Sequence, residues 1–291
     1  MRIRAKGGNE MNIGIRLHDT VPGTLEERLG YAKAQGFTCA HLAMSKAIQG
    51  FSMDRAPKLF TDELAAQVKT AFAEKQMSCA VLGCYLNLAN INEEELKKTQ
   101  EIYHAHLRFA RKIGAGVVGT ETGPAKGNVF AEPAPQSEEA FQLFIRCLTP
   151  IVRWAEEEDA IIAIEPVCEH IISTPERAER MLDLLPSDHL RIILDSVNLL
   201  SAEGALHADD IIADAIRRLG DKVSVLHMKD FLPIRPEDTR AQSVACGKGI
   251  MDYTRLLTFA KKYDLPMTLE DTVPDNAQAA REHLEKIAQT L

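Results

Sequence analysis

The sequence predicts an α/β protein that forms a single closed (β/α)8 barrel. Short apolar runs alternate with helical patterns eight times along the 291 residues. Four runs in the second half each end in a polar side chain that can bind a metal, at positions 165, 195, 227 and 270. One strand with its return helix takes about 30 residues or slightly more, which matches this spacing. Such a barrel needs roughly 250 residues, and the chain has no composition break suited to a linker.

The first half of the chain contains four predicted strand–helix units. The predicted strands are residues 11–17, 38–44, 78–85 and 115–120. Thr24 and Glu27 predict a capping box that opens a helix ending near Gly36. Asn92 and Glu95 predict a second capping box, opening a helix that ends at 113. The helix at 62–75 follows a long loop, and the apolar positions between 141 and 152 recur at helical spacing.

The second half repeats the same alternation four more times. The predicted strands are residues 161–165, 190–195, 223–227 and 266–270. Thr174 followed by Pro175 predicts a helix start, because proline is favoured at the first helical position. Further helices are predicted near 211–219, 253–263 and 277–289. A doubly wound open sheet is the alternative, but no G-x-G-x-x-G follows the first strand and eight units exceed the usual number.

Composition and charge exclude several classes of protein. The net charge of −8 and the pI near 5.6 argue against broad binding to nucleic acid, which relies on clustered Lys and Arg. The sequence contains no run of 18 apolar residues, so no membrane span is predicted. The six cysteines lack paired CxxC spacing, which is typical of a reduced, cytoplasmic protein. Residues 1–10 are predicted to be a disordered leader, so the barrel is predicted to span 11–291.

The four polar strand ends predict one metal site. In a (β/α)8 barrel the carboxyl ends of neighbouring strands converge on one mouth, which brings Glu165, Asp195, His227 and Glu270 together. Three crowded carboxylates repel one another, whereas a divalent cation turns that repulsion into coordination. Three oxygen ligands and one imidazole suit Mn²⁺ or Mg²⁺, and Co²⁺ and Zn²⁺ are also compatible.

The motifs around these residues resemble a known family. They are Ile-Glu-Pro at 164–166, Leu-Asp-Ser-Val-Asn at 194–198, Leu-His-Met-Lys-Asp at 226–230 and Leu-Glu-Asp at 269–271. This pattern resembles the xylose isomerase-like TIM-barrel superfamily, in particular its sugar (phosphate) isomerase/epimerase branch, which includes the ketose 3-epimerases. The resemblance covers nearly all of 11–291. It implies that Glu165, Asp195, His227 and Glu270 bind one divalent metal and that the two glutamates also move the proton.

This implied chemistry suits the residue types. Removing a proton next to a carbonyl leaves an enediolate, whose negative charge a metal stabilises as a Lewis acid. Glu165 and Glu270, from strands across the mouth, would flank a bound ketose, keto-sugar acid or sugar phosphate. Returning the proton to the opposite face gives an epimer, and returning it to the neighbouring carbon gives the aldose–ketose isomer. The sequence leaves both outcomes open.

Five further residues are candidates for substrate binding. His18, Glu121 and His170 each follow a predicted strand and would face the mouth. Asn198 stands where the family's epimerases often carry histidine, and an amide can hydrogen-bond a hydroxyl but cannot act as an acid near neutral pH. Asp230 would orient a metal-bound water or a substrate hydroxyl.

The segment 229–249 is long enough to be a lid or substrate loop. It contains Arg235, Arg240 and Lys248, and barrel phosphate sites often use the loops after the seventh and eighth strands. A phosphorylated sugar is therefore one candidate substrate.

Other functions fit the same barrel. They are a metal-dependent dehydratase acting through the same enolate, a hydrolase like the endonucleases that cut at abasic sites, and a non-catalytic sugar-binding barrel. The negative charge argues against the endonuclease. Binding alone would not need both Glu165 and Glu270. A homo-oligomer is compatible with the sequence, although no feature identifies one.

Overall fold

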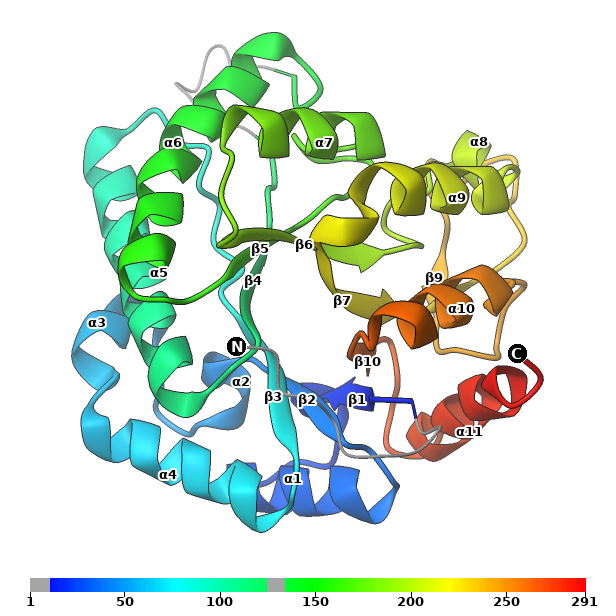
Figure 1. Ribbon diagram of the computed structural model, residues 1–291, viewed down its shortest axis with the longest axis horizontal. Helices are drawn as coiled ribbons and strands as arrows, with labels where there is room; N and C mark the ends of the chain where they lie inside the picture. Colours follow the sequence, from blue (N-terminus) through cyan, green and yellow to red (C-terminus); the bar gives the residue numbers. More distant parts are fainter. Residues whose placement is uncertain (1–10, 125–133) are drawn as a thin grey trace.

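The computed structural model describes residues 11–124 and 134–291 and contains the predicted closed barrel (Figure 1). All eight barrel strands pair in parallel, in the order β1-β10-β7-β6-β5-β4-β3-β2. The predicted leader, residues 1–10, lies outside the described residues. The barrel strands are β1 (Ile13–Arg16), β2 (Cys39–Leu42), β3 (Ser78–Gly83), β4 (Val117–Glu121), β5 (Ile162–Glu165), β6 (Leu190–Asp195), β7 (Val223–Met228) and β10 (Met267–Leu269).

Eight longer helices surround the strands, as the alternation predicts (Figure 1). They are α1 (Leu25–Ala34), α4 (Asp62–Glu74), α5 (Glu93–Ile113), α6 (Glu138–Glu157), α7 (Pro175–Leu184), α9 (Ala208–Leu219), α10 (Thr254–Tyr263) and α11 (Ala277–Ala288). The capping box of Thr24 and Glu27 is confirmed, and Pro175 is the first residue of α7. The second capping box is wrong. Asn92 caps α5, but the Glu95 carboxylate accepts a hydrogen bond from Asn90 instead of closing the box.

Three single-turn helices were not predicted. Within the described residues α2 (Met44–Ala47) and α3 (Ala56–Leu59) lie in the segment predicted as a long loop, and α8 (Ala202–Ala205) precedes α9. Each is four residues long, so it lacks the repeated apolar spacing that reveals a longer helix. The predicted number of eight helices therefore holds only for the longer ones.

The segment after β7 is more ordered than the sequence indicates. Residues Asp230–Phe231 (β8) and Ser243–Val244 (β9) form a small antiparallel hairpin. The Asp230 carboxylate anchors it, because one oxygen accepts the backbone N–H groups of Phe231 and Met251 and the other accepts that of Gly247. Two-residue strands carry too little alternation to be predicted.

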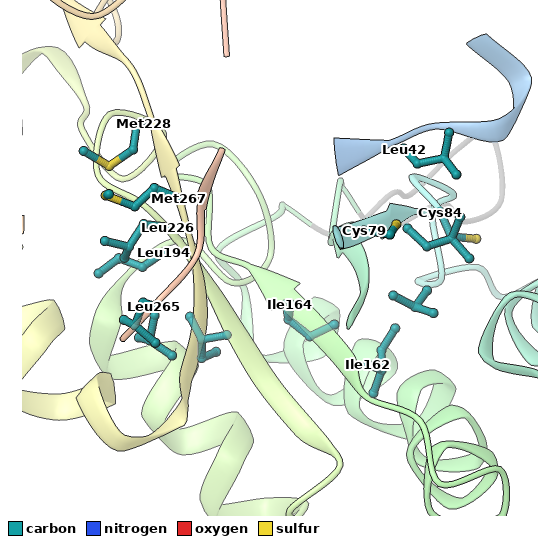
Figure 2. Close-up of a cluster of buried hydrophobic side chains, with 14 of the residues drawn as sticks. Leu42, Cys79, Cys84, Ile162, Ile164, Leu194, Leu226, Met228, Leu265 and Met267 are labelled. Atoms are coloured by element: carbon teal, nitrogen blue, oxygen red, sulfur yellow. The ribbon is translucent and has the colours of Figure 1, made fainter. Parts of the chain in front are cut away.

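The barrel strands bury both faces. One set of alternate residues packs against the helices, and Figure 2 shows several of them, including Ile162 and Ile164 of β5 and, apart from these, Leu226 and Met228 of β7. The other set forms a separate small cluster: Cys39, Ala80, Val81, Val117, Ala163, Ile193 and Val225. Because side chains alternate along a strand, this second set fills the barrel interior.

Two residues further along each strand, the interior becomes polar. Register pairs Arg16 with His41, Glu121 with Glu165, and Asp195 with His227. Glu270 follows β10 directly, beside Met228. Seven strands therefore end near one level in charged or imidazole side chains, above an apolar interior. No helix in the described ranges is long and apolar enough to cross a bilayer.

A close approach between β1 and β2 requires glycine at position 14. A Cβ at Gly14 would overlap the Cys39 backbone carbonyl, which cannot move aside. We expect Gly14→Ala to lower the free energy of unfolding by about 1–3 kcal/mol. Gly30→Ala is the matched control, because Gly30 lies in α1 with no atom nearer than 3.8 Å, and it should stabilise the protein by about 0.5–1 kcal/mol. Urea denaturation measures both, and a neutral Gly14→Ala variant would contradict the packing argument.

His106 is a buried histidine far from the barrel mouth. Its Nδ1 bonds the Ile102 carbonyl, its ring packs edge-on against Phe60, and burial lowers its pKa to about 4. Because an unfolded histidine titrates near 6.5, the stability that neutral His106 contributes is present above pH 6.5 and is lost as the pH falls toward 4.

Between pH 7 and pH 5 we expect the wild type to lose about 2 kcal/mol more unfolding free energy than His106→Gln. Urea melts at each pH provide the measurement. His104→Gln, on the same helix, retains His106 and should follow the wild type. Parallel curves for the wild type and His106→Gln would refute the assignment.

Candidate active site

The four residues predicted to bind a metal lie together at the barrel mouth. His227 Nδ1 is 3.1 Å from Glu165 Oε2 and 3.2 Å from Glu270 Oε1. Glu165, Asp195 and His227 each offer a ligand atom within 4.8 Å of the other two. All four side chains are buried. The strand ends thus bring three carboxylates and one imidazole into a single cluster.

Short hydrogen bonds fix the carboxylates within this cluster. One oxygen of Asp195 accepts the backbone N–H groups of Val197 and Asn198, which leaves Oδ2 facing the cluster. Glu165 Oε1 accepts a 2.6 Å hydrogen bond from the Asn198 amide, which leaves Oε2 beside His227. Each carboxylate therefore has one oxygen engaged by the protein and one directed at the shared centre.

The donor atoms of the cluster fit a divalent cation. Among the described residues, both ring nitrogens of His227 and Oδ2 of Asp195 are buried and make no hydrogen bond of regular geometry. His227 Nδ1 and Asp195 Oδ2 have charged neighbours instead, the two glutamates and Lys229, and burying such groups without hydrogen bonds is costly. Ligands about 2.1 Å from an ion and at right angles lie about 3 Å apart, which is close to the distances from His227 Nδ1 to the two glutamates. The donor set thus suits a metal.

His41 is a site residue that the sequence analysis missed. Its ring lies between Tyr85 and His227, with centroid separations of 5.6 and 5.4 Å, and its Nδ1 is 3.7 Å from Glu270 Oε1. Gly83 makes room for it, because a Cβ there would be 2.7 Å from His41 Nε2. The one signal in the sequence is a histidine within an otherwise apolar strand.

Two cations at the site, buried Lys229 and half-buried Arg16, were also missed. Lys229 Nζ lies 2.9 Å from Asp195 Oδ2 and 3.1 Å from Glu270 Oε2. Arg16 Nη1 lies 3.3 Å from the same Glu270 oxygen. Strands β1, β2 and β7 therefore contribute side chains to the site besides the four predicted residues. Lys229 lies two residues after His227, and Arg16 is the last residue of β1. Both hold interior-facing positions at strand ends, which could have identified them.

The charges of the cluster depend on one another. Burial disfavours ionised Asp195 and raises its pKa to about 6, although Lys229 opposes this shift. Burial also opposes ionisation of Glu270, but His227 and Lys229 outweigh it and hold its pKa well below the usual range. For His227, burial disfavours the cation, yet Glu270 and Glu165 prevail and raise its pKa to about 9. Glu270 is therefore held as an anion by neighbouring cations.

The predicted substrate-binding residues lie in different surroundings. Glu121 and His170 face each other, with His170 Nδ1 3.6 Å from Glu121 Oε2. Burial together with repulsion from Glu165 raises the pKa of Glu121 to about 7. His18 is centred 6.4 Å from His41, and burial with nearby Arg16 lowers its pKa to about 4.

Asn198 touches the cluster directly, whereas Asp230 is 1% exposed and has both oxygens committed to backbone N–H groups. The substrate-binding roles of all five residues stay predictions.

Solved structures with similar folds include enzymes of more than one kind. The 3-keto-D-glucoside 4-epimerase YcjR from E. coli is 18% identical, with a TM-score of 0.73 over 97% of this chain and 100% of that chain. The probable 3-DHS dehydratase AsbF from Bacillus anthracis is 13% identical, with a TM-score of 0.70 over 94% and 98%. IolI, solved with a bound zinc atom, is 18% identical, with a TM-score of 0.68 over 96% of both chains. At these identities the likeness shows the shared fold.

Sequence comparison gives the family. No curated protein matches this chain. The family model described as xylose isomerase-like TIM barrel matches residues 29–290, which include all four strand-end residues of the cluster. This match confirms the resemblance seen in the strand-end motifs, and the chain belongs to the xylose isomerase-like TIM barrel family.

Proposed function

We propose that the protein is a divalent-metal-dependent isomerase that epimerises or isomerises a ketose, keto-sugar acid or sugar phosphate through an enediolate. The observation that carries this proposal is the placement of Glu165 and Glu270. Their carboxylates approach the same nitrogen of His227 from strands that β6 and β7 separate. Two buried carboxylates around one centre suit a reaction in which one group removes a proton and another returns it.

The metal would be held by Glu165, Asp195, His227 and Glu270. When bound, the ion supplies Lewis acidity, which lowers the energy of negative charge on the substrate oxygen. The three oxygen donors favour Mn²⁺ or Mg²⁺, with Co²⁺ and Zn²⁺ as alternatives. Asp195 Oδ2 and the His227 ring nitrogens support this assignment, because they are buried and make no hydrogen bond of regular geometry.

The two glutamates would carry the proton. One carboxylate removes the proton from the carbon beside the carbonyl, and the other glutamate, protonated, delivers one to the opposite face. Lys229 and Arg16 keep Glu270 ionised, and Asn198 orients Glu165. Delivery to the same carbon inverts it, whereas delivery to the neighbouring carbon interconverts aldose and ketose.

Isotope exchange tests the proposed reaction. Protein supplied with Mn²⁺, Mg²⁺ or Co²⁺ in D₂O should incorporate deuterium at a carbon next to the carbonyl of one ketose, keto-sugar acid or sugar phosphate. Glu165→Gln and Glu270→Gln should each lower kcat by about 10²–10⁴, because each removes an acid–base group. Glu139→Gln, an exposed position on α6, is the control.

Mass spectrometry and NMR measure the exchange and the product. Absence of exchange across a broad panel would refute the isomerase proposal. Exchange accompanied by loss of water would instead identify a dehydratase that shares the first step.

Metal content tests the proposed ligands separately from turnover. Asp195→Asn and Glu165→Gln keep the side-chain shape but remove a charged ligand oxygen. Each should lower Mn²⁺ affinity at least about tenfold, because ligand and supporting groups commonly contribute this much. Calorimetry and elemental analysis after dialysis measure the binding, with Glu139→Gln again as the control. Unchanged metal binding in both variants would refute the four-residue site.

A further inference from the structure

The buried ammonium of Lys229 is the least expected group at the mouth. The residue is 6% exposed, and its Nζ makes ion pairs with Asp195 Oδ2 at 2.9 Å and Glu270 Oε2 at 3.1 Å. Its backbone carbonyl accepts a hydrogen bond from the Tyr253 hydroxyl, which fixes the chain at this point. Burying an ammonium costs several kcal/mol unless anions are placed beside it. The fold therefore holds Lys229 at a defined position between two of the proposed metal ligands.

Asn198 extends this contact to the other glutamate. Lys229 Nζ donates to Asn198 Oδ1 at 3.1 Å, and Asn198 Nδ2 donates to Glu165 Oε1 at 2.6 Å. An ammonium can only donate and an ionised carboxylate can only accept, so the two partners dictate the orientation of the amide. A carboxylate in place of Asn198 would lack the donor. The chain Glu270–Lys229–Asn198–Glu165 thus joins the two proposed proton carriers.

Lys229 also shares an oxygen with the proposed ion. Asp195 Oδ1 is committed to two backbone N–H groups, so Oδ2 is the oxygen available to a cation, and Lys229 lies on it. At Glu270 the two carboxylate oxygens have different neighbours. Oε1 faces His227 and His41, whereas Oε2 faces Lys229 and Arg16. The ammonium therefore turns Oε1 toward His227 and at the same time repels a divalent ion bound at Asp195.

We propose that Lys229 and Asn198 are a positioning pair that fixes both glutamates for proton transfer and that Lys229 weakens the hold of the site on its metal. The first part rests on the proposed function, whereas the second concerns ion binding alone. The pair acts through Glu165, Glu270 and Asp195.

The two effects of Lys229 have opposite signs, which separates them from a structural role. Lys229→Met keeps the aliphatic length and removes the charge. It should raise Mn²⁺ affinity at least about tenfold, because a like charge near the ion is gone. The same variant should lower kcat about 100-fold with KM changed less than about threefold, because Glu270 loses its orientation. A lysine needed only for packing would weaken metal binding and turnover together.

The experiment compares Lys229→Met, Lys229→Arg and Lys69→Met. Mn²⁺ affinity is measured by calorimetry, and thermal unfolding is followed with and without Mn²⁺. Lys229→Arg keeps the charge, so its affinity should stay within about threefold of the wild type and part of the turnover should return. Lys69→Met makes the same substitution at an exposed position on α4, and it should change nothing. Mn²⁺ should also raise the unfolding temperature of Lys229→Met more than that of the wild type.

Asn198→Asp tests the amide. It leaves an acceptor for Lys229 but removes the donor to Glu165, so kcat should fall about 100-fold with little change in KM. Wild-type turnover in Asn198→Asp would overturn the coupling of the two glutamates.

Unchanged or weaker Mn²⁺ binding by folded Lys229→Met would overturn the proposal for Lys229. If that variant does not fold, Lys229→Gln decides the question by the same criterion. A wild type that exchanges no substrate proton would refute the proposed function. The Mn²⁺ affinities of the Lys229 variants would still test whether Lys229 weakens metal binding.

Discussion

The structure of the mouth depends on the burial of three carboxylates around one imidazole. Glu165, Asp195 and Glu270 are at most 5% exposed, and no apolar environment tolerates three such charges without compensation. The compensation comes from Lys229, Arg16 and His227, whose pKa the neighbouring glutamates raise. Anions and cations lie at one level of the barrel, directly above small apolar side chains that fill the interior. These small side chains form the apolar floor of the site.

The compensation is unequal between the two glutamates. Glu270 lies within 3.3 Å of both Lys229 and Arg16, whereas Glu165 is held by the Asn198 amide and His227. Cations stabilise the ionised form of Glu270 more strongly than an amide stabilises that of Glu165. Chemically similar side chains at similar strand ends thus differ in how readily each accepts a proton. That difference comes from Arg16 on β1 and from Lys229, two positions after His227. The four proposed ligands alone do not determine it.

The sequence was sufficient for the barrel and for the four clustered residues, because both depend on repetition. Eight similar units reveal a barrel, and a polar residue at the same point in four successive units reveals a site. His41, Arg16 and Lys229 have no such repeat, and a lone polar residue near a strand end is ordinary. Their importance follows from closure of the sheet, which places β1 beside β10 and so brings Arg16 to Glu270 across 254 positions of sequence. The short helices and the β8–β9 hairpin escaped prediction because four- and two-residue elements show no period.

The anchoring of the hairpin by Asp230 links the rim to the centre of the mouth. His227, Lys229 and Asp230 lie within four consecutive residues. One short piece of backbone therefore carries a proposed metal ligand, the ammonium that pairs with two other ligands, and the carboxylate that binds the segment up to Met251. Displacing that segment would strain the same backbone that aims the imidazole and the ammonium. Any coupling between this segment and the cluster is reciprocal, so a ligand that restrained the segment would bind more tightly when the segment was ordered. The backbone from His227 to Asp230 is the direct covalent connection between the two.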